Sequence, residues 1–364
     1  MNSITKPEVV WIEGRCYRVN DSSTADVRRL IEHDIYENEV EFQDLDGDED
    51  NDDCKVVMVH PNRYYANLHV SQHFMGKIIG KKGATKMGIQ RDTKTDIKIP
   101  KHGEDTDIVI YGPAPANVKA ARRRINIIVM AAKEKLPYTH FISIPFNQAA
   151  VMERFEKFKA TVLRDYNGRG LDESCFIRAS KLHITVRMLS LMDNEERLLA
   201  SKVLTEANEK VIRPMLKDYL PLRIRLKGLS YMNDDPKEMH VLYGRVEEDE
   251  GPTGILQDTV NALAEFLYKT GVVINRFNDS SVKMHVTLIN TRYRNSGSQS
   301  DEEGSSSKKN TARESFDGSK ILSSLGDYDF GVVEWRDIHL SQRSVVGPDG
   351  YYQATHVVSC VGNN

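Results

Sequence analysis

Two short stretches of the chain repeat the same residue types around a histidine and a threonine. They read LHITV, which contains His183 and Thr185, and MHVTL, which contains His285 and Thr287. One neutral histidine can accept a proton from an attacking hydroxyl or water, and a second, protonated one can donate a proton to the leaving oxygen. Threonine hydroxyls can donate to the oxygens where negative charge grows. The motifs therefore predict acid–base cleavage of a phosphodiester, with a bell-shaped pH profile near neutrality and no metal or cofactor.

A histidine followed two residues later by threonine or serine is a common pattern, and the chain contains others. His69-Val70-Ser71 falls at a predicted earlier strand, and His339-Leu340-Ser341 follows the second motif. A single motif of this kind more often holds a structural histidine, whereas two matched motifs favour a shared site. We therefore interpret His339 as structural, since it falls after the second motif and outside the lobes that carry the pair, with Arg343 a candidate for contact with substrate.

The residues around each motif predict a β-strand. Side chains alternate along a strand, so the histidine and threonine of one motif share a face, about 6.6 Å apart, and the apolar residues share the other. Between residues 137 and 364 the order strand, helix, strand occurs twice, which predicts two similar lobes that bring the motifs face to face. The polar, serine-rich stretch near 295–318 is predicted to be a disordered insertion.

On these motifs, residues 137–364 resemble the two-histidine (LigT-like) phosphoesterases, whose bilobal α+β domains hold both motifs in a central cleft. The resemblance implies that His183 and His285 are catalytic and that Thr185 and Thr287 bind phosphate. It also implies activity on 2′,3′-cyclic phosphates, 2′-5′ linkages or RNA 3′ ends, among which the motifs do not choose. The alternative is a non-catalytic RNA-binding scaffold that regulates a partner helicase.

A glycine-rich loop lies in a basic stretch of the chain. Residues 54–136 hold 16 lysines and arginines against six acids, and Gly80-Lys81-Lys82-Gly83 follows Gly76 and Lys77. Glycines let the backbone approach phosphates closely, and lysines add attraction that needs no base identity. The predicted order βααββα and this loop resemble a type I KH domain, which clamps about four nucleotides of single-stranded RNA or DNA. One departure from the family is Lys86, where an apolar residue is usual.

The first 53 residues are strongly acidic, with 16 acids and five basic residues. VVWIEGRCYRV (9–19) predicts a strand pair, and the acidic run 41–53 predicts a partly disordered, partner-binding segment. A calcium loop starting at Asp44 fails, because Glu49 and Lys55 stand where glycine and glutamate are required. Four scattered cysteines indicate a reducing compartment, and no apolar run suggests a membrane partner.

The order of the two domains carries a further resemblance. A KH domain followed by a two-histidine domain, with VWIEGRCYRVN ahead of them, resembles a subunit of a nuclear transcription-coactivator and alkylation-damage repair complex. That resemblance implies a nuclear location and a large helicase as the partner of the N-terminal region.

Overall fold

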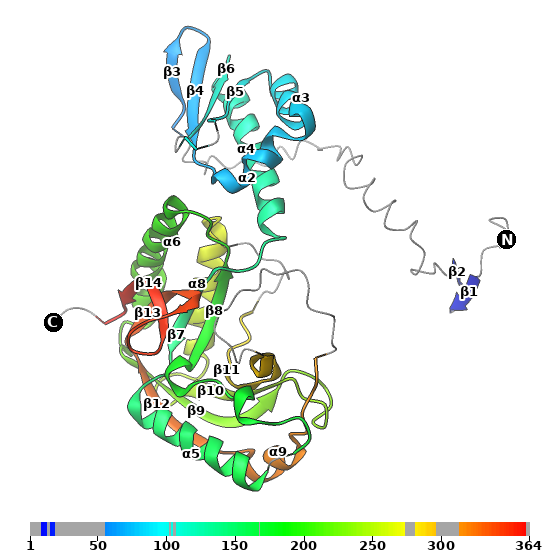
Figure 1. Ribbon diagram of the computed structural model, residues 1–364. Helices are drawn as coiled ribbons and strands as arrows, with labels where there is room; N and C mark the ends of the chain where they lie inside the picture. Colours follow the sequence, from blue (N-terminus) through cyan, green and yellow to red (C-terminus); the bar gives the residue numbers. More distant parts are fainter. Residues whose placement is uncertain are drawn as a thin grey trace. The chain divides into compact units, whose positions relative to one another are not determined.

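A computed structural model of the chain (Figure 1) describes residues 55–361, apart from 102, 105–106, 167, 274–280 and 296–312, together with two N-terminal strands. The chain divides into two units, Met1–Cys54 and Lys55–Asn364. In the first, β1 (Val9–Ile12) pairs antiparallel with β2 (Arg15–Arg18), which confirms the predicted strand pair. The acidic run 41–53 lies outside the described residues. Across the described chain, no helix combines the length and apolar character needed to cross a membrane.

The basic region folds as the order βααββα predicts. Its elements are β4 (Arg63–Leu68), α2 (Gln72–Ile79), α3 (Ala84–Thr93), β5 (Asp96–Lys98), β6 (Ile108–Gly112) and α4 (Pro115–Lys133). An additional strand, β3 (Val57–His60), extends the sheet to the order β3-β4-β6-β5 among the described strands. All four residues of β3 are exposed, so the strand has no buried face that an alternating pattern could reveal.

The helices of this region pack on one face of its sheet through their apolar stripes. Pro115 begins α4, and the spacing of Val118, Ala121 and Ile125 places all three on its buried face. Helix α2 buries Phe74 and Ile78 in the same layer. The loop that joins the end of α2 to the start of α3 lies outside this packing, and its lysines are exposed.

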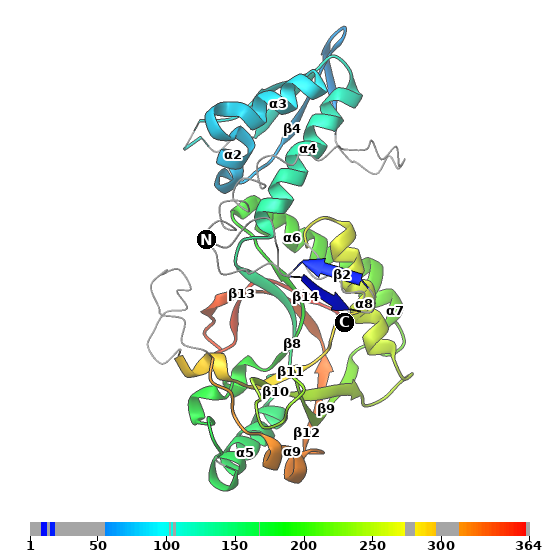
Figure 2. The same ribbon diagram turned by 90° about the vertical axis from the view of Figure 1, so that its right-hand side faces the viewer.

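Eight of the described strands of the second region form one curled sheet, in the order β12-β9-β10-β11-β8-β7-β13-β14 (Figure 2). Their bounds are β7 (His140–Pro145), β8 (His183–Leu189), β9 (Leu222–Tyr231), β10 (Val241–Glu248), β11 (Val286–Asn290), β12 (Asp329–Trp335), β13 (Asp337–Val346) and β14 (Tyr352–Ser359). The two motif strands, β8 and β11, are neighbours at the centre. Each belongs to one half of four strands. The two halves bring the motifs together as expected, but edge to edge within one sheet, with β8 beside β11.

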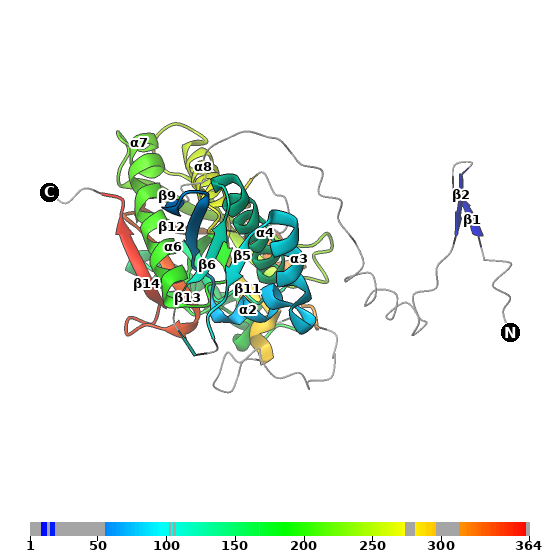
Figure 3. The same ribbon diagram turned by 90° about the horizontal axis from the view of Figure 1, so that it is seen from above.

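The helices cover the apolar side of this sheet. They are α5 (Ala149–Asp165), α6 (Asn194–Ala207), α7 (Arg213–Met215), α8 (Ile255–Lys269) and α9 (Ser319–Leu325). Figure 3 shows α6 and α8 close together, and α5 packs on β12, where Phe158 meets Phe330. Ile184 and Val286, the central apolar residues of the two motifs, are fully buried in the single core between sheet and helices. The opposite face of β8 and β11 is therefore left to the histidines and threonines.

Part of the predicted insertion is packed. Phe316 is fully buried and forms a bridge with Met239, so residues 313–318 belong to the folded domain. The serine-rich core of the insertion, 296–312, lies outside the described residues.

Candidate active site and nucleic-acid loop

The strand register brings the two motifs together on one face of the sheet. Ile184 of β8 lies directly opposite Val286 of β11 in an antiparallel pair. Continued by one residue either way, this register sets His183 beside Thr287 and Thr185 beside His285. Directly opposite residues of such strands have Cβ atoms about 4.5–5.5 Å apart. The four predicted site residues therefore form a rectangle, with one histidine at each of two opposite corners.

A backbone carbonyl fixes the orientation of each imidazole. Nδ1 of His183 lies 2.7 Å from the carbonyl oxygen of Lys181, and Nδ1 of His285 lies 2.7 Å from that of Lys283. A carbonyl oxygen only accepts, so Nδ1 carries the proton and Nε2 is the nitrogen of the neutral ring that can accept one. Nε2 of His183 meets the Thr185 hydroxyl at 3.1 Å.

The two histidines differ in their electrostatic environment. Burial lowers the pKa of His183 to about 4. The hydrogen bond to the Lys181 carbonyl raises this pKa, and the charges of His285 and Lys181 lower it further. Burial also lowers the pKa of His285, opposed by the Lys283 carbonyl, and this shift is the smaller of the two. His183 is therefore the stronger candidate for a neutral base, and His285 for the acid.

Aromatic side chains that the sequence analysis missed surround the motifs. The ring of Tyr352 lies 5.4 Å from that of His183, and the ring of Tyr243 lies 5.4 Å from that of His285. Tyr351 is buried and its hydroxyl meets Ser143 at 2.9 Å, next to Thr185 in the register. The adjacent tyrosines in YYQATHVVSC were the available signal, but nothing local in the sequence links them to a motif more than 160 residues earlier.

The third histidine motif is part of the same sheet, so the expectation that it lies outside the two lobes is wrong. His339 on β13 lies opposite Ser143 on β7, and Ser143 lies opposite Thr185 on β8. The His339 ring also meets Tyr351 at 5.6 Å. Arg343 lies further along β13. Burial raises the pKa of Tyr293 and the charge of Arg343 opposes that shift, which places Arg343 near the segment that follows the second motif.

The glycine-rich loop has the conformation that its glycines allow. Gly80 (φ 72°) and Gly83 (φ 83°) both have positive φ, and a Cβ at Gly80 would overlap the Thr85 hydroxyl. Between them, Lys82 also takes a left-handed conformation (φ 53°), and the side chains of Lys81 and Lys82 are exposed. The loop thus presents two cations next to the start of α3, as predicted for a phosphate contact. Helix α3 forms despite Lys86, and Ile89 and Thr93 are its buried residues.

His69 connects the two folded regions. Its Nε2 lies 3.0 Å from Asp193, the N-cap of α6, and its Nδ1 lies 3.4 Å from Asp107. Lys133 of α4 pairs with Glu196 of α6 at 2.6 Å nearby. Both contacts end on the first turn of α6, so His69 serves a structural contact and lies apart from the central rectangle.

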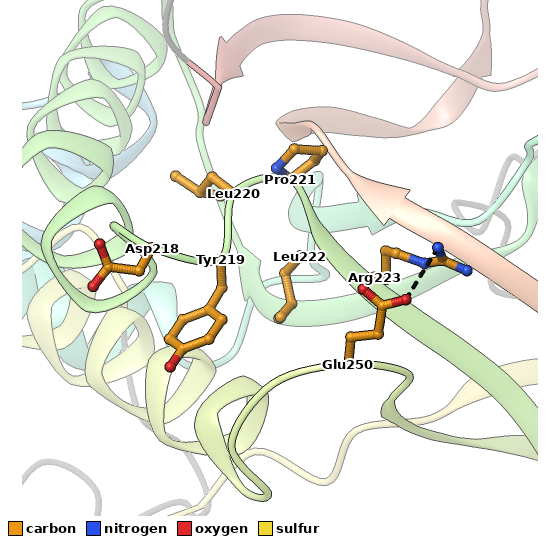
Figure 4. Close-up of a pocket in the computed structure, with 7 residues that line it drawn as sticks. All are labelled: Asp218, Tyr219, Leu220, Pro221, Leu222, Arg223 and Glu250. Carbon is orange, nitrogen blue, oxygen red and sulfur yellow. Dashed lines mark ion pairs between the residues drawn. The ribbon is translucent and has the colours of Figure 1, made fainter.

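A pocket of about 220 Å³ lies away from the motifs, where the chain enters β9 (Figure 4). Its lining includes Tyr219, Pro221 and Arg223, which pairs with Glu250 at 3.2 Å. None of the four motif residues lines it. Within the described ranges, no three histidine, cysteine, aspartate or glutamate side chains gather in a way that could hold a metal ion.

Comparison with known proteins matches both regions to families. Residues 138–360 match the AKAP7 2'5' RNA ligase-like domain, and residues 66–127 match the KH domain. Over 358 residues the chain is 32% identical to mouse (Mus musculus) activating signal cointegrator 1 complex subunit 1, covering 96% of this chain and 97% of that protein. The chain belongs to the family of that subunit. Membership in the cointegrator-subunit family confirms the predicted fold, a KH domain followed by a phosphoesterase-like domain, and supports RNA binding.

Solved structures of lower identity are also similar to this member of the cointegrator-subunit family. E. coli LigT complexed with 3'-AMP is 13% identical, with a TM-score of 0.36, and the match covers 62% of this chain and 98% of that one. A structure described as a phosphoesterase is 13% identical, with a TM-score of 0.34, covering 61% and 98%.

Proposed function

We propose that the chain is an RNA-binding subunit whose second domain cleaves RNA phosphodiesters by metal-independent acid–base catalysis. The observation that carries this proposal is the pairing of Ile184 with Val286, which brings the two histidines and two threonines together where β8 meets the start of β11. These four residues come from two segments about 100 positions apart in the chain. They lie together on the face of the sheet opposite the hydrophobic core. Packing alone does not require polar side chains of these types in that arrangement.

In the proposed reaction His183 is the base and His285 the acid. Nε2 of His183 takes the proton of the attacking hydroxyl, whose oxygen forms a bond to phosphorus. The bond from phosphorus to the leaving oxygen breaks, and His285 gives that oxygen a proton from its Nε2. Thr287 donates a hydrogen bond to a non-bridging oxygen. The Thr185 hydroxyl, which lies 3.1 Å from Nε2 of His183, donates to another non-bridging oxygen once the attacking hydroxyl takes its place at that nitrogen. The two carbonyl contacts at Nδ1 hold both rings with Nε2 toward the phosphate.

The KH domain supplies single-stranded RNA to this cleft in our proposal. Its loop binds the backbone through exposed lysines and backbone amides, without reading bases. The two sites then act on one strand, and the KH domain raises the local concentration of substrate at the cleft.

An assay on oligonucleotides with defined ends tests the proposal. The purified chain is incubated with RNA ending in 2′,3′-cyclic phosphate, RNA with a 2′-5′ linkage and RNA with an ordinary 3′ end, with and without EDTA. We expect turnover of at least one substrate that persists in EDTA. Loss of activity in EDTA contradicts the mechanism. Binding of RNA without turnover of any substrate favours the scaffold alternative, in which the chain binds RNA without cleaving it and regulates a partner helicase.

We also propose that the chain acts in the nucleus, within the activating signal cointegrator complex, in transcription and alkylation-damage repair. The support is the relative's own description as a subunit of that complex. The proposed partner is the large helicase subunit, bound by the acidic residues 1–53. Co-purification of tagged full-length chain and of a chain lacking residues 1–53 tests this. Equal recovery of the helicase with both chains contradicts the assignment of the docking segment.

A further inference from the structure

A lysine precedes each motif histidine by two residues, a feature of the sequence that the motifs themselves do not include. The two stretches read Lys181-Leu-His-Ile-Thr and Lys283-Met-His-Val-Thr. The Lys181 ammonium lies 4.8 Å from the centre of the Tyr352 ring, and the Lys283 ammonium lies 5.5 Å from that of Tyr243. Each of these tyrosines also packs against the histidine of the same motif. The same group of lysine, tyrosine and histidine therefore occurs twice.

The tyrosine rings hold the ammonium groups near the histidines. A cation over an aromatic face is attracted by the ring quadrupole, which limits the positions that a flexible lysine samples. The charge of each lysine is felt at its histidine, where it lowers the pKa in both motifs, after the larger effect of burial. Each cation therefore lies beside the reaction centre, at the side chain that would transfer a proton.

The register sets the order of these groups along the sheet. Since Ile184 is opposite Val286 in antiparallel strands, Lys181 and Lys283 lie three positions from this pair in opposite directions. Extended chain of that length spans at most about 10 Å on each side. Lys181 closes a short 3-10 turn (Ala179–Lys181) before β8, and Lys283 lies in the segment before β11, so the two lysines enter the pair from opposite ends. The reacting phosphate would lie at the centre of this strand pair, with one cation beyond it at each end.

We infer that Lys181 and Lys283 form two further phosphate subsites, so that the cleft takes an internal linkage of a single-stranded oligonucleotide with a phosphate on each side. The inference rests on the proposed function and names its substrate class. With His183 as base, the attacking 2′-hydroxyl belongs to the upstream nucleotide, so Lys181 binds the upstream phosphate. His285 protonates the 5′ oxygen of the downstream nucleotide, so Lys283 binds the downstream phosphate. A mononucleotide cyclic phosphate fills neither subsite.

Tetranucleotides test this assignment. Each contains one ribose, just upstream of the central linkage, so that only this linkage can be cleaved, and either the upstream or the downstream phosphate is replaced by a neutral methylphosphonate. The full chain is used in its Lys81→Asp, Lys82→Asp form to suppress binding by the KH loop. Lys181→Gln and Lys283→Gln are compared with Lys269→Gln, an exposed lysine on α8 that pairs with Glu265.

We expect Lys181→Gln to lower kcat/KM about 3- to 10-fold on the fully charged substrate, and to have no further effect once the upstream phosphate is neutral. Lys283→Gln behaves in the same way with the downstream phosphate, and Lys269→Gln has no effect on any substrate. An equal loss on charged and neutral substrates overturns the inference, because the lysine then acts on its histidine alone. If Lys181→Gln instead responds to the downstream phosphate and Lys283→Gln to the upstream one, the subsites are supported and the assignment of base and acid is overturned.

Binding of the all-deoxy tetranucleotide separates this inference from the proposed function. If no substrate is turned over, the proposed function fails, but the subsites are still read from the dissociation constants of the charged and methylphosphonate forms. An increase of about 3- to 10-fold in the dissociation constant, seen only when the matching phosphate is charged, supports the subsites, since this is about the strength of one partly exposed charge contact. Identical binding by parent and lysine variants overturns them.

Discussion

At the scale of single residues, the site depends on what holds each imidazole. The carbonyls of Lys181 and Lys283 fix Nδ1 of both rings, so that the two Nε2 atoms serve the same surface. His356 offers a comparison on the same sheet. Its Nε2 meets Thr205 of α6 at 2.9 Å, so it lies on the face that the helices cover. Position on the sheet, and not residue type, separates a candidate catalytic histidine from a structural one.

Replacement of either motif histidine by alanine is predicted to remove most of the activity. We expect kcat to fall about 10²- to 10⁴-fold for His183→Ala or His285→Ala, since each performs one proton transfer. The double variant should lose far less than the product of the two effects, because the pair acts as a unit. Initial rates on the best oligonucleotide substrate provide the measurement.

His356→Ala is the matched control for these variants and should retain activity per folded molecule. Thr185→Val and Thr287→Val should each lower kcat by about 10²- to 10³-fold at most, because each removes one hydrogen bond to the transition state. Circular dichroism should show that all the motif variants fold, because their side chains lie away from the core. Full activity in His183→Ala would overturn the mechanism.

The pH profile is predicted to peak on the acidic side of neutrality, below the value expected from the motifs alone. The base must be deprotonated, so kcat/KM rises as pH increases through the pKa of His183, about 4. The acid must be protonated, so kcat/KM falls through the pKa of His285, which burial lowers from 6.5. Rates from pH 3.5 to 8 at low substrate concentration test this. A maximum above pH 7 would contradict the assigned environments.

At the scale of elements, the loop between α2 and α3 and the pairing of β8 with β11 perform separate tasks. The loop is built locally, since glycines at both ends permit positive φ and the lysines between them remain exposed. The strand pair is built by a contact about 100 residues apart in the chain. Changes in the loop should therefore alter nucleic-acid binding without altering the cleft.

Reversal of charge in the loop is predicted to weaken single-strand binding. Lys81→Asp with Lys82→Asp removes two cations, so the dissociation constant should rise about 10-fold or more at low salt, and log K should depend less steeply on log salt. Fluorescence anisotropy over a salt series measures both. The control, Lys157→Asp with Lys269→Asp on α5 and α8, makes the same charge change at exposed pairs with Glu153 and Glu265. Equal binding by loop variant and parent would show that the loop is not the clamp.

At the scale of the whole molecule, two contacts join the KH region to the first turn of α6. Burial alone would lower the pKa of His69, but hydrogen bonds to Asp193 and Asp107 and their charges raise it above 6.5. Lys133 and Glu196 form the second contact, and both side chains are largely buried. Asp193 and Glu196 also cap α6: the Asp193 side chain accepts from Glu196 N at 2.9 Å, and the Glu196 side chain accepts from Met192 N at 2.8 Å.

His69 is predicted to stabilise the folded chain in mildly acidic solution. Because its folded pKa is raised, its contribution is fully present below pH 6.5 and is lost as pH rises through the raised pKa. His69→Gln should lower Tm by about one or two degrees at pH 6, because it removes a partly exposed ion pair. The decrease should be smaller at pH 8.5. Thermal unfolding of both proteins from pH 5.5 to 8.5 provides the test. An equal Tm difference at every pH would show that charge on His69 is not involved.

The sequence by itself determined the features that short-range patterns encode. Alternation around His183 and His285 predicted strands with a polar face, and Gly80 and Gly83 predicted the loop, because both follow from the conformations of neighbouring residues. Tertiary structure alone decided that β8 and β11 are adjacent, that β13 brings His339 beside β7, and that Tyr351 and Tyr352 reach His183. Strand partners are chosen by packing and register across the whole chain, and burial then sets the pKa of each histidine, so neither can be read from local residue types.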